Sequence, residues 1–448
     1  MKNKEKTITE FLDNEYKEFA LYSIEGRAIS SVIDGFKPVQ RKVIHVSSQI
    51  WKTGSEKTMK IFQLSGKVAS DCFYHHGDMS LSNAIINMAQ KFKNNAPLLE
   101  EDGQFGSLRS PQAGAPRYIG TRLSKYFKLI YKDFDLLEFK EEEGDKIEPK
   151  YFLPIIPTIL INGGSGIAVG FASNILNRNV LDVISECEKY LKGKDPINIP
   201  PKLNGFLGSY NQDPENPKKW IITGKLEIVN TTTIRISELP PSMTYEKYED
   251  ILDKLVENKS ISSYDDNCKD NINYTIKMSR SDLSSLTESD LIKLLKLEES
   301  ETEIYTTLDE SGKLKIFESV SEIIKYFVDF RLSFYQKRKD FLIDKTSKEL
   351  KVLQMRGKFI KLILDGKIII NNKSKVDIIQ KIEENNIDKI DGDYDYLLRM
   401  PIHSLTKETF EKLKEEFTQK KSELESTKLL DPKNMYLEDL KELKKSFK

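Results

Sequence analysis

The sequence has 448 residues, 38% hydrophobic and 10% aromatic, which is long enough for two to four domains with hydrophobic cores. Its 70 Lys+Arg balance 70 Asp+Glu, but residues 27–132 hold 16 Lys+Arg against 7 Asp+Glu, so the charge is unevenly distributed. No run approaches the roughly 20 apolar residues that span a bilayer, the N-terminus lacks a signal peptide's apolar core, and the three cysteines form no CxxC pair. We therefore expect a reduced, cytoplasmic protein without a disulfide framework or a cysteine-based zinc site.

The first half of the chain is expected to begin with a helix and continue with short elements. Residues 7–27 carry apolar side chains at roughly helical spacing after a Thr-rich start: Ile8, Phe11, Leu12, Phe19 and Leu21. From there to about residue 143, short helical patterns alternate with glycine turns and end in the charged stretch EFKEEEGD. Pro38 fits the first turn of an apolar helix over 39–46.

The second half is predicted to be mixed α/β and then strongly helical. The β-branched stretch YFLPIIPTILINGGSGIAVGF at 151–171 is typical of buried strands, and WIITGKLEIVN, TTIRISEL and NYTIKM are further strand-like runs. Beyond about residue 321, apolar residues recur at helical spacing in two places: Phe327, Phe334 and Phe341, then Phe410, Leu413, Phe417 and Leu424. Two long amphipathic helices, one out and one back, would pair as an antiparallel coiled coil.

The stretch AGAPRYIGTRLS at 113–124 places Arg117 directly before Tyr118. A tyrosine can attack phosphorus and form a covalent intermediate, and an adjacent cation would stabilise the transition state. The small residues before Arg117 would let a nucleic-acid backbone approach closely. Taken alone, the pair fits equally a half-buried tyrosine with a solvated arginine beside it.

Two further basic stretches are candidate phosphate contacts. In FYHHGD, the adjacent His75 and His76 point in different directions, which suits phosphate contacts better than a two-histidine metal site, although a structural pair fits too. In DGFKPVQRK, residues 34–42, three cations flank an expected helix N-terminus, which is typical of a phosphate site or of a solvated helix start. The excess of positive charge over 27–132 favours a polyanion partner, or marks a basic surface without that function.

Three other patterns do not support a cofactor site. GGSGIAVG at 163–170 lacks the GxGxxG spacing of a dinucleotide site, and no GxxxxGK[ST] occurs for a nucleotide triphosphate. DGDYD at 391–395 resembles a carboxylate cluster for Mg²⁺, but its setting between helical segments favours a loop and helix cap.

Taken together, these stretches resemble the DNA-cleaving part of type IIA topoisomerases. GRAISSVIDGFKPVQRKV, YHHGDMSLSNAIINMAQ, DGQFGSLRS, GAPRYIGTRLS and FLPIIPTILINGGSGIAVG follow the family's order and spacing over most of the chain. GKIIINNKSK and YDYLLRMPIHSLTKE are similar to the eukaryotic and T-even bacteriophage branches rather than to bacterial gyrase. The Lys-, Ile- and Asn-rich composition also fits an AT-rich viral genome.

The resemblance implies an α+β multidomain fold and a role for each matching residue. The domains would be an N-terminal helical arm (1–30), a winged-helix domain with the catalytic tyrosine (31–145), a mixed α/β tower domain (146–320), and a coiled coil with a C-terminal dimer gate (321–448). Tyr118 matches the nucleophile that becomes a 5′-phosphotyrosine, Arg117 matches the arginine that stabilises the transition state, and Ile167 matches the isoleucine that wedges between base pairs. The remaining DNA-binding residues implied are Arg27, Lys37, Arg41, Lys42, Lys67, His75, His76 and Arg122.

The resemblance also implies partners and cofactors. Two tyrosines act, one per strand of double-stranded DNA, so a homodimer is expected. The family needs ATP and Mg²⁺, and neither an ATPase nor an acidic metal-binding domain is recognised here, so both are expected from a partner subunit. No DNA-wrapping domain is recognised, which favours relaxation and decatenation over supercoiling. Met79 and Asn83 replace the serine and acidic residue on which quinolones depend.

Two other classes remain as alternatives. The chain could be a structural DNA-binding and dimerising protein descended from such enzymes, a hypothesis that loss of Arg117 or Tyr118 would favour, and both are present. A tyrosine recombinase would need a dispersed set of Arg and His around its tyrosine, and that set cannot be assembled from this sequence.

Overall fold

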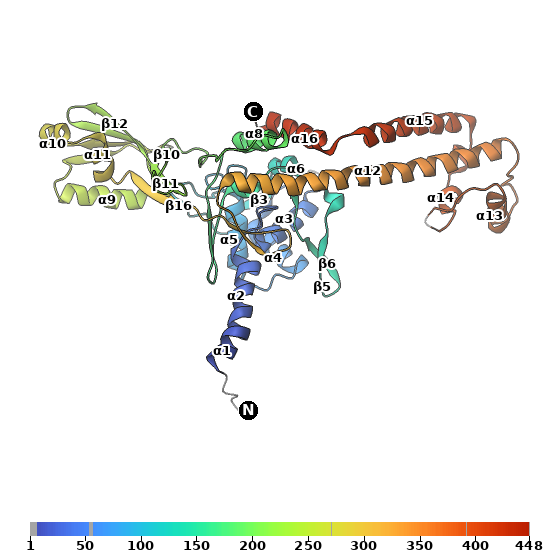
Figure 1. Ribbon diagram of the computed structural model, residues 1–448, viewed down its shortest axis with the longest axis horizontal. Coiled ribbons are helices and arrows are strands. Elements are labelled where there is room, and N and C mark those ends of the chain that lie inside the picture. Colours follow the sequence, from blue (N-terminus) through green and yellow to red (C-terminus); the bar gives the residue numbers. More distant parts are fainter. Residues whose placement is uncertain (1–6, 53–56, 270, 391, 448) are drawn as a thin grey trace. The chain divides into compact units, whose positions relative to one another are not determined.

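The computed structural model describes residues 7–52, 57–269, 271–390 and 392–447. Its contacts divide the chain into two compact units, Met1–Arg331 with Asp439–Lys448, and Leu332–Glu438. Figure 1 shows the elements of both units, and each unit is described by itself. The division into four domains at 30/31, 145/146 and 320/321 stays a prediction.

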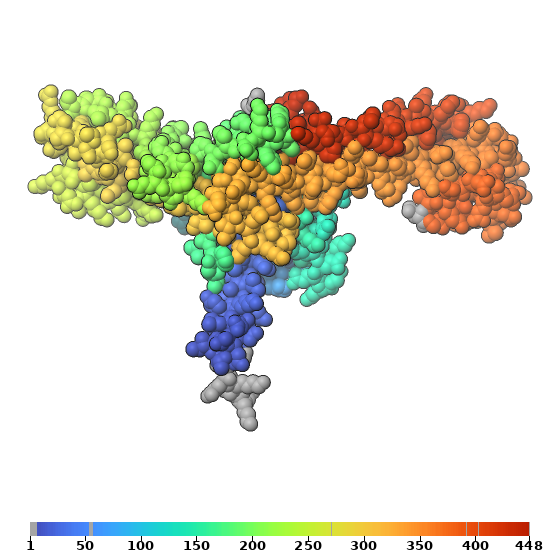
Figure 2. Space-filling view, in the orientation of Figure 1, coloured from blue at the N-terminus to red at the C-terminus, as the bar shows by residue number. Residues whose placement is uncertain are grey.

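The predicted N-terminal helix is present, but it is not a regular α-helix. It runs through four consecutive segments: α1 (Ile8–Phe11), η1 (Leu12–Tyr16), α2 (Lys17–Ser23) and η2 (Ile24–Ala28), with π-helical geometry in η1 and η2. Thr7 caps its start by accepting a hydrogen bond from the Glu10 backbone, as the Thr-rich start predicts. Its large apolar side chains as far as Tyr22 are exposed, with Ile8 79% and Phe19 59% accessible, whereas Ile24 and Ala28 at its end are buried. The blue segment in Figure 2 shows this helix standing out from the unit.

The part of the first unit that carries Tyr118 combines helices with a small sheet. The helices are α3 (Pro38–Ile50), α4 (Ile61–Asp71), α5 (Asp78–Ala89) and α6 (Lys125–Ile130). The antiparallel sheet has the order β1-β3-β2, formed by β1 (Met59–Lys60), β3 (Gly120–Leu123) and β2 (Leu99–Asp102). Pro38 is the first helical residue of α3, as predicted, because its fixed φ suits that position and its missing N–H is not needed there.

The stretch at 151–171 differs from the strands predicted for it. Only β7 (Leu153–Pro154) and β8 (Gly164–Ile167) are strands; the run between them forms the short helix α7 (Thr158–Asn162). Ile159 and Leu160 are buried, so the prediction of burial is correct, but a short apolar run does not distinguish a buried strand from a buried helix. Around it lie three two-stranded sheets: β4 (Tyr131–Lys132) with β7, β5 (Phe139–Glu142) with β6 (Asp145–Pro149), and β8 with β9 (Ala172–Ile175).

The rest of the first unit contains the predicted strands. WIITGKLEIVN, TTIRISEL and NYTIKM form β11 (Lys219–Thr223), β12 (Lys225–Asn230), β13 (Thr233–Glu238) and β15 (Tyr274–Lys277). With β14 (Ser263–Asp266), three of them make a sheet of order β12-β13-β15-β14, whose apolar face packs with α9 (Tyr245–Glu257), α10 (Arg280–Ser285) and α11 (Glu288–Leu294). The other elements are α8 (Val180–Leu191), β10 (Ser209–Gln212), β16 (Glu298–Thr302), β17 (Thr306–Leu308) and β18 (Leu314–Ile316).

The second unit is helical. It contains most of α12 (Val320–Leu364), then α13 (Lys375–Glu384), α14 (Asp395–Leu398), α15 (Lys407–Leu429) and the start of α16 (Pro432–Ser446). The returning helices run antiparallel to α12: Glu349 pairs with Lys420 at 3.0 Å, and the rings of Tyr335 and Tyr436 stack with centroids 4.5 Å apart. A separate cluster that includes Phe359, Ile382 and Leu397 packs α13 and α14 against the end of α12.

Candidate functional site

Tyr118 lies at the end of an irregular loop, residues 103–119, that joins β2 to β3. Its backbone N–H donates to the Ala115 carbonyl at 2.9 Å, and its own carbonyl accepts from Lys60 Nζ at 2.7 Å. The start of α4 also holds this loop, because Phe62 N donates to the Pro116 carbonyl at 3.1 Å. The backbone at Tyr118 is therefore fixed, while its side chain is 72% exposed.

Two cations lie beside Tyr118. The Arg117 guanidinium carbon is 6.0 Å from the centre of the Tyr118 ring, and the Arg117 side chain is exposed. Lys60, whose ammonium reaches the Tyr118 carbonyl, is the second. Lys60 was not predicted from the sequence, because 58 residues separate it from Tyr118 and only the pairing of β1 with β3 brings them together. Arg122, on β3, is paired with Glu100 at 2.6 Å and is 30% exposed.

Five of the predicted DNA-binding residues line two neighbouring cavities. A cavity of about 520 Å³ is lined by Tyr22, Arg27, Lys42, His75 and His76, among others. A second cavity, of about 470 Å³, is lined by Arg27 and Lys37 together with Asn83. Arg27 therefore borders both cavities, and its side chain is exposed.

The two histidines point to different partners, as their adjacency predicts. His76 Nε2 is 2.7 Å from the Tyr22 hydroxyl, and its ring packs against Tyr74 with centroids 5.2 Å apart. His75 Nε2 lies 3.2 Å from a Glu142 carboxylate oxygen, and its side chain is 73% exposed. Neither histidine is part of a buried core, so both remain accessible to a phosphate.

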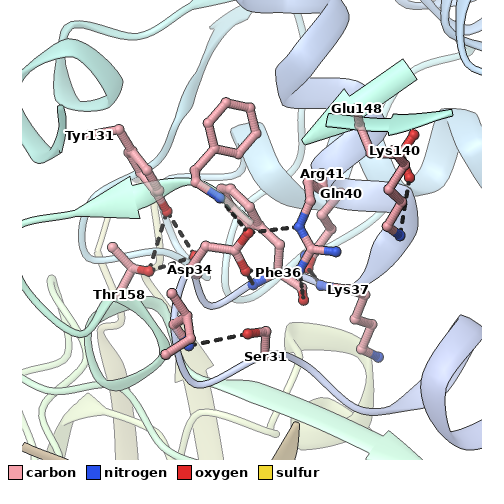
Figure 3. A network of polar contacts seen from close by, with 12 residues as sticks. Ser31, Asp34, Phe36, Lys37, Gln40, Arg41, Tyr131, Lys140, Glu148 and Thr158 are labelled. Atoms are coloured by element: carbon pink, nitrogen blue, oxygen red, sulfur yellow. Dashed lines mark hydrogen bonds and ion pairs between the residues drawn. The ribbon is translucent and has the colours of Figure 1, made fainter. Parts of the chain in front are cut away.

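Arg41 lies in a buried polar network rather than on an open surface (Figure 3). Asp34 accepts from Arg41 Nε at 2.7 Å and from Nη2 at 3.0 Å, and Arg41 is only 5% exposed. Burial alone would lower the pKa of Arg41, but the Asp34 charge and hydrogen bonds raise it, so the guanidinium stays charged. Contrary to the sequence-based expectation, the structure does not present Arg41 to a DNA surface, because its guanidinium is engaged inside the domain.

A separate group of polar contacts engages Lys42. Its ammonium donates to the Cys72 carbonyl at 2.6 Å and to Glu148 at 2.9 Å, and Lys140 reaches the other Glu148 oxygen at 3.5 Å. Tyr131 and Thr158 donate to the Asp34 carbonyl at 3.0 and 2.8 Å, which closes the network of Arg41 on its other side (Figure 3). Lys42 borders the cavity of the histidines but is largely neutralised by Glu148.

Ile167 is the most exposed large apolar side chain of the described residues, at 89%. It ends β8, opposite Ala172 in the hairpin with β9. Lys37 Nζ fixes this hairpin through the Ser165 carbonyl at 2.8 Å, and burial lowers the pKa of Lys37. At Gly166 a Cβ would overlap the Ala28 carbonyl oxygen, so only glycine permits this close approach. Ile167 is therefore not a core residue.

The remaining predicted positions lie on two helices. Lys67, on α4, pairs with Asp71 one turn on at 2.9 Å and is 46% exposed. Met79 and Asn83, on α5, are both exposed. Glu100 and Asp102, two carboxylates of β2, bond to Arg122 and to Thr58.

A metal site is not formed by the part of the chain that the structure describes. Within it, no three His, Cys, Asp or Glu side chains are grouped so that they could hold a metal ion. In the DGDYD stretch, Asp395 lies in the first turn of α14 and Asp393 accepts from its backbone N–H at 2.8 Å, while the N-cap residue is Tyr394, whose side chain makes no capping bond. Asp391 lies outside the described residues. In the described ranges no helix is both long and apolar enough to span a membrane.

Comparisons with known proteins identify the family of this chain. The sequence matches the family of the A subunits of DNA gyrase and topoisomerase IV over residues 27–442. It is 34% identical over 443 residues to the DNA topoisomerase medium subunit of Enterobacteria phage T4, covering 98% of each chain. It is 34% identical over 459 residues to the mitochondrial DNA topoisomerase 2 of Dictyostelium discoideum, covering 98% of this chain and 35% of that protein.

A solved structure is similar as well. The crystal structure of the Plasmodium falciparum topoisomerase II DNA-binding, cleavage and re-ligation domain matches with a TM-score of 0.85 and 33% identity, over 98% of this chain and 64% of that one. The chain thus spans about a third of the length of the eukaryotic relatives and nearly all of the phage one. The chain belongs to the family of the gyrase and topoisomerase IV A subunits, and it resembles the cleavage region of type II topoisomerases in sequence and in structure.

Proposed function

We propose that this chain is the DNA-cleaving subunit of an ATP-dependent type II topoisomerase, with Tyr118 as its nucleophile. The observation that carries the proposal is an exposed phenol on a fixed backbone, with the Arg117 guanidinium beside its ring. A buried tyrosine could not reach a phosphate, and a mobile one would lose the benefit of orientation. The family relationship supports the same assignment.

In the proposed reaction the Tyr118 hydroxyl oxygen attacks a backbone phosphorus. The bond from phosphorus to the 3′ oxygen breaks, the proton from tyrosine ends on the departing 3′ oxygen, and a 5′-phosphotyrosine forms. The exchange of one phosphodiester for another makes religation possible by the reverse path. Arg117 would stabilise the negative charge on the phosphoryl oxygens of the transition state, and Lys60 is placed to add to that field.

The DNA would be held by the cations and histidines that line the two cavities. Four side chains border these cavities and can contact phosphates: Arg27, Lys37, His75 and His76. Two further cations of the same unit, Lys67 and Arg122, are partly exposed. Ile167, which projects from its hairpin, would insert between base pairs and bend the duplex. We assign Arg41 and Lys42 the role of stabilising the domain beneath these contacts.

The proposed reaction needs other chains. A homodimer would supply one tyrosine per strand, and the winged-helix and dimer-gate regions would join its copies. Mg²⁺ would be bound by an acidic domain of a partner subunit, because the residues described here form no metal site of their own. The same partner subunit would bind ATP. Bound there, the metal would help the departing 3′ oxygen. Relaxation and decatenation remain the activities we expect, and Met79 and Asn83 depart from the quinolone-binding pattern of the family.

The test is a Tyr118→Phe variant reconstituted with the ATPase subunit, Mg²⁺ and plasmid DNA. The variant should form no protein-linked DNA ends, while DNA affinity changes less than a few-fold, because phosphate contacts dominate affinity. Tyr126→Phe is a matched control, since Tyr126 stacks on Phe447 and should keep cleavage near the wild-type level. Covalent adducts in Tyr118→Phe would assign the nucleophile elsewhere, and binding without adducts in the wild type would favour a structural DNA-binding protein.

A further inference from the structure

The loop that carries Arg117 and Tyr118 has little internal structure to hold its shape. Between β2 and β3 its main internal bonds run between Ser107 and Ser110, at 2.8 and 3.2 Å, and from Gly114 N to the Gln104 carbonyl at 2.9 Å. Gln90, at the end of α5, supports it from outside by donating to the Phe105 carbonyl at 2.7 Å. Together with the bonds from Phe62 to Pro116 and from Lys60 to Tyr118, these few bonds hold local turns and the end of the loop at Tyr118, but they do not attach residues 107–110 in its middle to the rest of the unit.

Arg109, in the DGQFGSLRS stretch, attaches this middle part of the loop. Its side chain is 6% exposed, and Nη1 donates to the carbonyls of Pro240 at 2.6 Å and Met243 at 2.8 Å. Nη2 donates to the Leu239 carbonyl and to the Glu238 carboxylate, both at 2.5 Å. The Arg109 carbonyl in turn accepts from Tyr245 N at 3.1 Å. One residue of the loop is thus bonded to the whole corner between β13 and α9.

The corner itself belongs to a well-packed structure. Glu238 is 5% exposed, and its second oxygen accepts from Leu207 N at 3.0 Å. Leu239 and Tyr248 on either side of the corner are fully buried in the apolar cluster beneath the four-stranded sheet. A guanidinium with five donors in a rigid plane can bind several carbonyls and a carboxylate at once, which no other side chain can reproduce.

From these contacts, and resting on the function proposed above, we infer that Arg109 is a positioning residue for cleavage. It fixes the middle of the loop of Arg117 and Tyr118 to the β13–α9 corner, so that the four-stranded sheet acts together with the contacts of Lys60 and Phe62 in setting the position of the nucleophile. Arg109 is too buried to touch DNA, and its effect on the reaction is therefore indirect. Bending of DNA against this part of the unit would reach Tyr118 through the same attachment.

The competing interpretation is that Arg109 only stabilises the fold. Removing one partner of a buried ion pair leaves the other charge uncompensated and destabilises a protein wherever the pair lies. Arg331→Met is a matched control: Arg331 is fully buried and pairs with Asp133 at 2.5 Å, but Asp133 and the Pro154 carbonyl, to which it also donates, lie outside residues 103–119. Arg109→Met and Arg331→Met should therefore lose similar thermal stability.

The experiment compares the full chain carrying Arg109→Met, Arg109→Lys or Arg331→Met with the wild type. Amide hydrogen exchange of Ser107, Ser110 and Gly114 should become at least about tenfold faster in Arg109→Met and stay near wild type in Arg331→Met. With the ATPase subunit, single-turnover DNA cleavage at a temperature where all variants are folded should fall at least about tenfold in Arg109→Met, with DNA affinity within about threefold. Arg109→Lys, which restores one charge without the planar fork, should recover only part of the rate.

Unchanged exchange in the loop of Arg109→Met, or an equal loss of cleavage in Arg331→Met, would overturn the inference. The exchange measurement needs no activity, so it decides the structural attachment even if the wild-type protein cleaves no DNA. Absence of cleavage in the wild type would refute the proposed function instead. The two failures are therefore distinguishable.

Discussion

Ile167→Ala separates DNA bending from folding. A buried isoleucine truncated to alanine would lower the free energy of unfolding by about 2–5 kcal/mol. Ile167 is 89% exposed, so its truncation should change that free energy by no more than about 0.5 kcal/mol, as at ordinary surface positions. The melting temperature should therefore stay at the wild-type value.

The truncation should instead reduce DNA bending and DNA cleavage. Bending a short duplex sharply requires on the order of 1–6 kcal/mol, and an inserted side chain offsets part of it by opening a base step. If the wedge supplies even about 1.4 kcal/mol of that energy, its removal lowers the bent population about tenfold. We expect a smaller bend angle, measured by energy transfer across an end-labelled duplex, and cleavage slower by about tenfold or more with the ATPase subunit present.

Ile228→Ala is a matched control, because Ile228 is also an exposed isoleucine on a strand, 49% accessible on β12. Its truncation removes the same atoms and should leave bending and cleavage unchanged. An unchanged bend angle in a stably folded Ile167→Ala protein would refute the wedge assignment. An early thermal transition would show instead that the exposure of Ile167 is not maintained in solution.

Three more predictions concern the close packing at Gly166, the buried His45 and the proposed ATPase subunit. Gly166→Ala should lower both the melting temperature and the rate of DNA cleavage, because the added Cβ would meet the Ala28 carbonyl oxygen. Gly66→Ala, on α4 with open space around it, should instead stabilise the helix by about 0.5–1 kcal/mol. Equal melting temperatures of the two variants would contradict this prediction. Burial lowers the pKa of His45, so the unfolded chain binds the proton more tightly and the free energy of unfolding should fall as the pH drops below about 6.5. Urea titrations at about pH 7.5 and about pH 5 should show a smaller fall in His45→Gln than in the wild type. An identical fall in both proteins would assign the pH dependence to other groups. The purified chain alone should form dimers by sedimentation but neither hydrolyse ATP nor relax plasmid, and either activity in partner-free material would contradict the two-chain proposal.

The sequence predicted best what local chemistry determines. The start of α3 at Pro38 and the helix after Thr7 follow from backbone preferences and capping, which act over a few residues. The strands β11 to β13 follow from strand-like runs of β-branched and apolar residues with turn signals between them. The helix α7 was mistaken for strand, because a short apolar run has no period that separates the two, and only its packing decides.

The candidate site was predictable in its chemistry but not in its exposure. DGFKPVQRK contributes three cations that look equivalent in sequence, yet Asp34 engages Arg41, Glu148 engages Lys42, and only Lys37 reaches the hairpin of Ile167. Glu148 is 106 residues from Lys42 in sequence, so no local pattern could assign that pairing. Lys60 was not predicted, because 58 residues separate it from Tyr118.

These pairings change the meaning of the positive excess over residues 27–132. Two of its cations, Lys42 and Arg109, are paired with carboxylates from outside that segment, Glu148 and Glu238, and are buried or nearly so. A cation that is already paired with a carboxylate inside the protein is not free to neutralise a DNA phosphate, so we expect neither residue to contribute strongly to the salt dependence of DNA binding. The charge available to a duplex is therefore smaller than the count of basic residues suggests. The exposed cations that remain include Arg27, which borders the two cavities, and Arg117 beside Tyr118. On the proposed function, an electrostatic contact there would also help to place the phosphate that is to be cleaved.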